Sequence, residues 1–192
     1  MPNPTEQKVI SAARECFFQH GYRASNMTMI SEYAGLSRAT VHKYARNKDD
    51  AFRKVCLDYQ EQAEKACEPI LEKDLECWVA IELIIGVWLK PTFDEVGNTR
   101  IINDLKYHVN QIAQDVFNQA RNALKDMLAA QIEKGLSQNT LSLSKLNLSS
   151  HELASLMLAS IDGLRGHYEK NELSQASQNT LSIFKLACSI KD

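Results

Sequence analysis

Hydrophobic residues recur three or four positions apart along most of this chain, which is the spacing of one helix face. Of the four prolines, two stand within the first four residues, so long segments remain free of helix breakers. The pattern predicts an all-α fold.

The same pattern, with its breaks at glycine and proline, predicts where the helices begin and end. The first is ended by Gly21, the second by Gly35, the fourth by Pro69 and the fifth by Pro91. A Ser/Asn/Leu-rich segment at 136–150 lacks periodicity and predicts a long surface connection. The expected helices cover residues 4–20, 28–35, 38–44, 47–68, 74–89, 98–106, 107–134, 150–170 and 174–190.

The short helices before and after Gly35 have the features of a helix-turn-helix. Gly35 tolerates the positive φ that a helix end needs, and Ser37 can cap the next helix with its hydroxyl. Leu36 fills the corner, and Val41 faces inward with it. We therefore expect residues 28–48 to form a DNA-reading motif that ends at the cap of a further helix.

The second of these helices should expose a small, polar and basic face that suits a major groove. Arg38 and Lys43 can contact phosphates or guanine, Thr40 offers a short hydrogen bond, and Ala39 permits close approach. The alternative is an ordinary helical corner whose basic residues are merely solvated.

In this region the sequence resembles the DNA-binding domain of TetR-family transcriptional repressors. The family pattern is an Ala-Ala-x-x-x-Phe helix, a Gly-Tyr corner, a Thr-x-x-x-Ile helix, Ala-Gly-Val-Ser, a recognition helix, and Asn/Ser-Lys-Asp/Glu. The chain departs from it at His42, where Tyr is usual, at Ala45, where Phe is usual, and at Ser31, where Ala is common. The matching residues are Ala12, Ala13, Phe17, Gly21, Tyr22, Thr28, Ala34, Gly35, Leu36, Ser37, Thr40, Val41, Tyr44, Asn47, Lys48 and Asp49.

The resemblance implies a DNA-binding domain at 1–47 and a helical ligand-binding and dimerisation domain at 48–192. In such proteins the last two helices pair with the same two helices of a second subunit in a homodimer. A ligand shifts the helix that follows the recognition helix. The alternative for the last two helices is that they only cover their own core. The expected DNA-binding residues are Thr28, Ser37, Arg38, Thr40, His42, Lys43, Tyr44 and Lys48.

A ligand cavity in the second domain is expected to have aromatic walls and a few polar groups. Each candidate has the alternative reading of an ordinary core residue, and Glu82 could equally face solvent or pair with a base. The candidates are Trp78, Glu82, Trp88, Tyr107, Gln111, Gln114, Phe117, Met127 and Met157.

Charge separates the two expected domains although the whole chain, with 22 Lys+Arg and 24 Asp+Glu, carries a net charge of −2. Residues 1–56 hold nine basic and five acidic side chains, whereas the remainder holds 13 and 19. A basic head on an acidic body suits a protein that holds DNA at one end.

Other chemistry finds little support in the sequence. Five cysteines without a C-x-x-C pair indicate reduced thiols in a cytoplasmic protein, and the polar N-terminus shows no secretory signal. A thiol switch between Cys67 and Cys77 is an open alternative. The five histidines have no metal-ligand spacing, so we expect no metal and no cofactor.

We therefore expect a cytoplasmic, homodimeric repressor that binds palindromic double-stranded operator DNA and is released by an unknown small molecule. No membrane partner is expected. One alternative is an architectural or interaction protein that binds DNA without a ligand. An enzyme is the other alternative, but no nucleophile elbow, metal motif or phosphate loop is present, so we expect none.

Overall fold

The computed structural model describes residues 3–89, 96–164, 167–168 and 170–190, and within these ranges the chain is helical without strands. The all-α prediction is confirmed. The helices are α1 (Pro4–Ala24), α2 (Met27–Ala34), α3 (Arg38–Tyr44), α4 (Lys48–Leu71), α5 (Cys77–Leu89), α6 (Thr99–Ile112), α7 (Gln114–Ser137), α8 (Ser150–Leu164) and α9 (Lys170–Ala187).

The chain divides into two compact units, each built from two segments of the sequence. Unit 1 comprises residues 1–63 and 91–120, and unit 2 comprises residues 64–90 and 121–192. The predicted boundary after residue 47 lies inside unit 1, at the beginning of α4. The division into a DNA-binding and a ligand-binding domain therefore stays a functional prediction.

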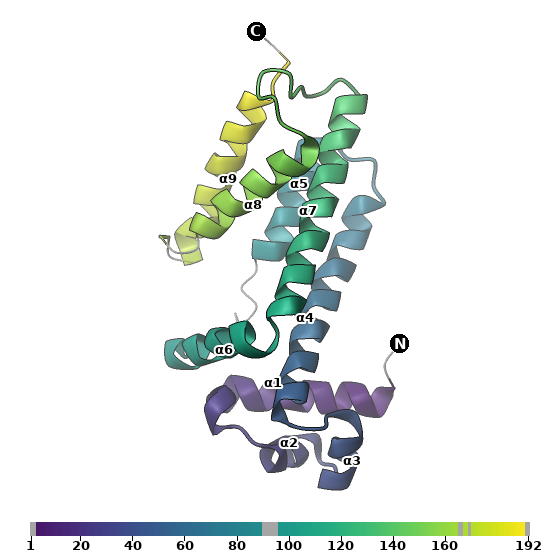
Figure 1. The fold of residues 1–192 in the computed structure, drawn as a ribbon, viewed down its shortest axis with the longest axis vertical. Coiled ribbons are helices and arrows are strands. Elements are labelled where there is room, and N and C mark those ends of the chain that lie inside the picture. The colour runs from purple at the N-terminus through teal and green to yellow at the C-terminus, as the bar shows by residue number, and fades with distance from the viewer. Residues whose placement is uncertain (1–2, 90–95, 165–166, 169, 191–192) are drawn as a thin grey trace. The chain divides into compact units, whose positions relative to one another are not determined.

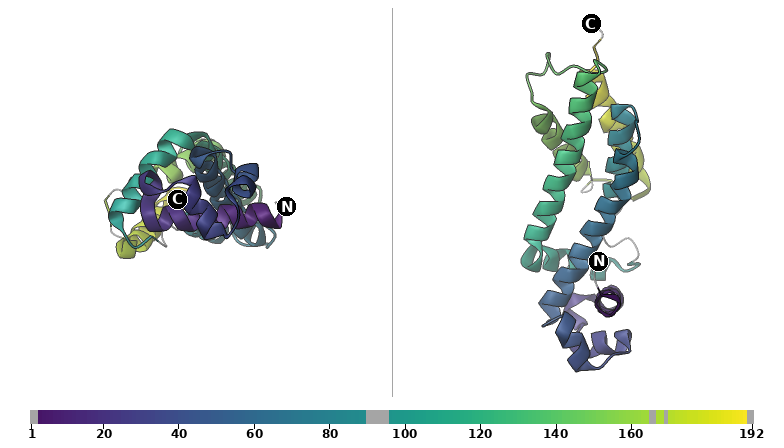
Figure 2. Two further views of the ribbon diagram at one scale, coloured as in Figure 1. Left: turned by 90° about the horizontal axis from the view of Figure 1, so that it is seen from below. Right: turned by 90° about the vertical axis from the view of Figure 1, so that its right-hand side faces the viewer.

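In unit 1, α1 lies between the pair α2 and α3 on one side and α6 on the other (Figures 1 and 2). Three aromatic rings fill the centre: Phe17 meets Phe52 edge-on at 5.2 Å and stacks on Tyr22 at 5.8 Å. Ile30 and Val41 are fully buried in the same core. Residues of α1 to α3 thus form one core, which α4 and α6 complete.

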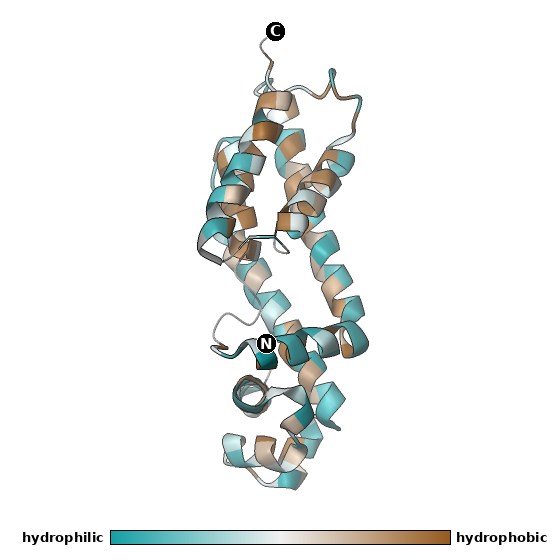
Figure 3. Cartoon of the chain, turned by 90° about the vertical axis from the view of Figure 1, so that its left-hand side faces the viewer, coloured by the Kyte–Doolittle hydropathy of each residue, from teal (hydrophilic) through white to brown (hydrophobic). Residues whose placement is uncertain are grey.

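Unit 2 has its own hydrophobic core, to which α5, α7, α8 and α9 contribute. Ile81, Leu128, Leu153 and Met157 are among its fully buried members. The helices α8 and α9 lie side by side, and hydrophobic positions recur along both (Figure 3). Their amphipathic patterns were predicted from the sequence.

Pro69 does not end α4 as predicted, because the helix continues to Leu71. Proline removes one N–H and disfavours the helical conformation of the residue before it, which costs least in a terminal turn. Here it stands in the last turn, so the helix stops only two residues later.

The boundary between α6 and α7 was also predicted wrongly. The break falls at Ala113, whose backbone leaves the helix at φ −132° and ψ 23°, and no glycine or proline marks it. Gly135 likewise does not close α7, which runs on to Ser137. A Cβ on Gly135 would stand 2.7 Å from the Cys77 sulfur, so this glycine serves close packing.

Further expectations need correction in unit 2. The apolar sequence of α5 predicts a central helix, but Val79, Glu82, Leu83 and Gly86 are exposed. The connection after α7 is not only a surface segment, since Leu141 and Leu143 are buried in the core. The helix predicted over 150–170 is also shorter, as α8 ends at Leu164 and α9 begins at Lys170.

Candidate DNA-binding site

The turn between α2 and α3 is fixed by backbone hydrogen bonds at Gly35. This residue adopts the left-handed conformation, with φ 57° and ψ 37°, and its N–H donates to the carbonyls of Glu32 and Ser31. The N–H of Leu36 donates to Ser31 as well, at 3.1 Å. The predicted helix end and corner are therefore where the sequence placed them.

Side-chain caps fix the beginnings of both helices. The Asn26 side chain accepts from the N–H groups of Thr28 and Met29 at 2.9 and 3.0 Å. The Ser37 hydroxyl accepts from the N–H of Thr40 at 3.1 Å. Such caps satisfy amides that the first turn of a helix leaves unpaired, so α2 and α3 are held rigidly although both are short.

One face of α3 is open to solvent, as the sequence predicted. Arg38, Ala39, His42 and Lys43 are exposed, whereas Val41 on the opposite side is fully buried. The exposed face is basic and contains no acidic side chain. It has the composition of a surface that enters a DNA groove.

The residues predicted to contact phosphates differ in their exposure to solvent and in the hydrogen bonds that they already make. Thr28 is exposed in the first turn of α2. The Nδ1 atom of His42 is hydrogen-bonded to the backbone oxygen of Arg46 at 3.0 Å. The hydroxyl of Tyr44 accepts a hydrogen bond from the Asn3 side-chain amide at 3.3 Å.

Lys48 faces inward in this structure. Its ammonium donates to the carbonyl of Tyr22 at 3.1 Å and lies 4.2 Å from the centre of the Tyr22 ring. The Tyr22 hydroxyl in turn donates to Asp49. Burial and this hydrogen bond raise the pKa of Tyr22, so the hydroxyl stays a neutral donor. Lys48 therefore ties α4 to the corner after α1.

Arg46 is a basic residue of this region that the sequence reasoning did not select. Its side chain is 86% exposed directly after α3, with Nε 3.7 Å from Asp50. Its position three residues beyond Lys43 is the sequence feature that could have identified Arg46 as a DNA-contact candidate.

Ala45, which replaces the usual aromatic residue of the family, is buried at the end of α3.

The residues predicted to line a ligand cavity do not form one site in either unit. In unit 2, Trp78 and Met157 are buried in the core, Trp88 and Met127 pack against it, and Glu82 is exposed. In unit 1, Tyr107, Gln111, Gln114 and Phe117 are all exposed. The reason is the misplaced helix break, which puts Tyr107 and Gln111 on α6 beside α1.

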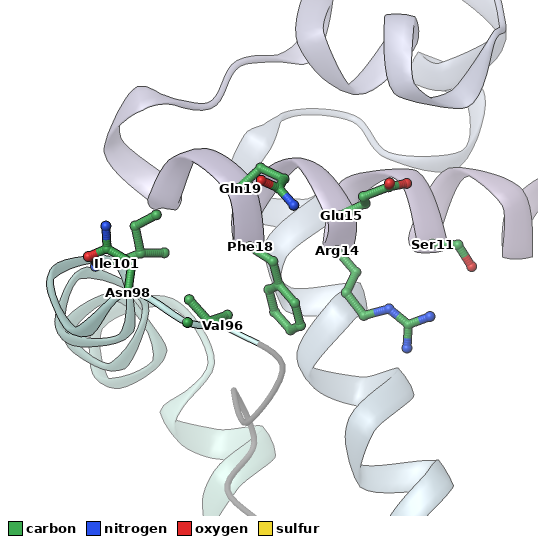
Figure 4. A pocket seen from close by; sticks show the side chains of 9 residues that line it. Ser11, Arg14, Glu15, Phe18, Gln19, Val96, Asn98 and Ile101 are labelled. Carbon is green, nitrogen blue, oxygen red and sulfur yellow. Dashed lines mark hydrogen bonds between the residues drawn. The ribbon is translucent and has the colours of Figure 1, made fainter.

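Two pockets in unit 1 flank α1, and the sequence reasoning did not anticipate them. The first, of about 570 Å³, lies beside Phe18 and Arg14, which leave α1 on the same side (Figure 4). Its lining also includes Ser11, Glu15, Gln19, Val96, Gly97, Asn98 and Ile101. The second, of about 620 Å³, lies at the end of α1 and includes Tyr107 from the predicted ligand set.

The cysteines in the described part of the chain are all free thiols, and Cys67 and Cys77 are both fully buried. Burial raises the pKa of each of these two thiols, which lowers their reactivity. Across the described ranges, His, Cys, Asp and Glu side chains do not gather in threes as metal ligands. Nor does any helix described here have the length and apolar character that crossing a membrane needs.

Comparison with known proteins agrees with the geometry of α1 to α4. The sequence model of the family described as "Bacterial regulatory proteins, tetR family" matches residues 9–55, which include the whole helix-turn-helix. Residues 9–55 therefore match the DNA-binding segment of the TetR family.

Among curated relatives, the HTH-type transcriptional repressor AcnR of Corynebacterium glutamicum is 27% identical over 74 residues, 38% of this chain and 38% of its own length. The matched segments span about a third of the curated relatives, 35% and 38%.

Two solved structures cover nearly the whole chain. A TetR transcription regulator from Haloarcula marismortui has a TM-score of 0.78 at 18% identity and covers 96% of this chain and 98% of its own. The flavonoid-responsive regulator FrrA has a TM-score of 0.65 at 21% identity, with 98% of each chain covered. At these identities the likeness establishes the fold alone.

Proposed function

We propose that this protein is a transcriptional repressor that binds a palindromic operator as a homodimer and leaves it when a small molecule binds. The observation that carries the proposal is the exposed basic face of α3, presented by two capped helices on a rigid core. Arg38, Thr40 and Lys43 would contact base edges, and Thr28, His42 and Tyr44 would contact phosphates. Lys48 would contact a phosphate after its ammonium leaves the Tyr22 carbonyl. Ser37 would act through its cap, by orienting the first turn of α3.

Exposed hydrophobic residues on α9 support the homodimer. Ile183 and Leu186 are 69% and 75% exposed, and Leu156 on the neighbouring α8 is 48% exposed. A group of large exposed apolar side chains is typical of an interface. Two copies joined there would present two α3 helices to half-sites about 34 Å apart, or a multiple of that spacing.

Release by a small molecule is supported by the likeness in fold to a flavonoid-responsive regulator. A DNA-binding protein without an effector is the second candidate. The exposure of Glu82, Gln111, Gln114 and Phe117 favours it, because these four side chains do not enclose a cavity.

The test is a nuclease footprint of the purified protein on the DNA upstream of its own coding region, with random duplex as competitor. The proposal expects a protected site with two inverted half-sites. Protection that follows no inverted repeat and vanishes in competitor would contradict the repressor and leave a non-specific DNA-binding protein. Protection unaffected by any of a panel of aromatic compounds would favour the effector-free candidate.

A further inference from the structure

A pocket of about 620 Å³ lies where the end of α1 meets the first half of α6, entirely within unit 1. Its lining includes the side chains of Arg23 and Arg100, the ring of Tyr107 and the amides of Asn98 and Asn103. The volume is that of a small-molecule site. We call it the α1–α6 pocket.

Asp104 fastens α6 to the end of α1 at the base of this pocket. Its carboxylate accepts the N–H of Arg23 at 3.0 Å and lies 3.3 Å from the Nε of the same residue. Gly21 makes this approach possible, because a Cβ there would stand 2.8 Å from Asp104 Oδ2. The Gly21 backbone, with φ 78°, also suits glycine alone among common residues.

The pocket holds more positive charge than this contact uses. Arg23 meets Asp104 through Nε, its side chain is 74% exposed, and its guanidinium lies 5.7 Å from the centre of the Tyr107 ring. Arg100 is exposed, and among the described residues no carboxylate lies within 4.0 Å of it. The lining thus contains two arginines and one carboxylate, beside a tyrosine ring that is 54% exposed.

We propose that the α1–α6 pocket binds a small organic anion, held by Arg23 and Arg100 through its carboxylate or phosphate group. Guanidinium forms paired, charge-assisted hydrogen bonds with both of these groups. The apolar part of the ligand would lie against Tyr107, and the amides of Asn98 and Asn103 would bind its remaining polar atoms.

Binding would act on the contact between α1 and α6. The anion would draw the Arg23 guanidinium away from Asp104 and would repel that carboxylate, so α6 would hold the end of α1 less firmly. Because α1 supports α2 and α3, DNA affinity would change with ligand occupancy. This consequence rests on the proposed DNA binding, whereas anion binding itself does not.

Binding is tested without DNA, with benzoate and inorganic phosphate as probes at constant ionic strength. We expect saturable shifts of the Gly21 and Arg23 amide resonances in NMR titrations. Arg100→Gln should weaken binding about tenfold, since one charge-assisted pair is lost. This variant leaves the contact of Asp104 with Arg23 intact, and Arg23→Gln provides a second test on the other guanidinium.

Lys106→Gln is the matched control, because Lys106 is an exposed base of α6 that does not line the pocket. It should bind both probes as the wild type does. The proposal is overturned if neither probe saturates, or if Lys106→Gln weakens binding as much as Arg100→Gln.

A DNA arm separates a free anion from a phosphate of the DNA backbone. If free probes fail to bind but Arg100→Gln lowers operator affinity, the pocket receives a DNA phosphate and the small-anion proposal is overturned. If the probes bind at the pocket while no operator is found, the pocket stands and the proposed function fails.

Discussion

At the scale of single residues, one ion pair in unit 1 gives a pH signature that can be measured. Both guanidinium Nη atoms of Arg53 on α4 donate to the Asp115 carboxylate in the first turn of α7. These hydrogen bonds lower the pKa of Asp115 to about 2, chiefly through the donation from Arg53.

We therefore predict that the Asp115 carboxyl titrates near pH 2 in the folded protein and near pH 3.9, about the ordinary value, in Arg53→Gln. A lowered pKa means that the pair stabilises the fold above about pH 4 and that this contribution is lost as the pH falls towards 2. Carbon-detected NMR of the Asp carboxyl resonances measures both midpoints. Equal midpoints in the two proteins would show that the ion pair does not persist in solution.

At the scale of elements, two exposed glycines make opposite demands on the backbone. Gly35 ends α2 with φ 57°, whereas Gly86 lies within α5, and a Cβ at either position would meet no atom within 4 Å. Steric contacts therefore do not distinguish an alanine at Gly35 from an alanine at Gly86, and backbone conformation alone decides the effect of each substitution.

Gly35→Ala should lower the free energy of unfolding by about 1 kcal/mol, because alanine is strained in the left-handed region. Gly86→Ala should raise it by about 0.5 to 1 kcal/mol, because alanine loses less conformational entropy in a helix. Urea denaturation of both variants measures the two changes. A gain in stability for Gly35→Ala would refute the capped corner between α2 and α3.

The sequence predicted helix boundaries best where a residue forces the backbone to turn. Gly35 and Ser37 located the end of α2 and the start of α3, because a left-handed glycine and a hydroxyl cap act within one turn of the helix. Ala113 gave no such signal, so the break between α6 and α7 was misplaced. Pro69 misled in the opposite way, since a proline in the last turn of a helix is tolerated.

The candidate DNA surface could be predicted for the same reason, as the exposed face of α3 follows from its own periodicity around Val41. The residues that line the pockets could not be predicted, because their surroundings depend on contacts between segments far apart in sequence. Asp104 and Gly21, which create the α1–α6 pocket, are separated by 83 positions. No local pattern connects them.

At the scale of the whole molecule, the exposed apolar residues of α9 determine the expected assembly. Leu186→Glu should convert the proposed dimer into monomers, because a carboxylate buried in an apolar interface without a partner is costly. Sedimentation velocity of the purified protein measures the change. Leu71→Glu is the matched control, since Leu71 is also exposed, at 40%, but lies at the end of α4. A wild-type monomer, or a dimer that survives Leu186→Glu, would contradict an interface through α9.

Fluorescence anisotropy with the footprinted operator across a salt series measures whether the basic face of α3 reads DNA. We predict that Arg38→Ala/Lys43→Ala weakens operator binding at least about a hundredfold, because both side chains would contact base edges. Lys106→Ala/Lys125→Ala removes the same charge from outside this face and should bind nearly as the wild type does. Equal losses in the two double variants would contradict the account, because binding would then follow net charge and not the surface of α3.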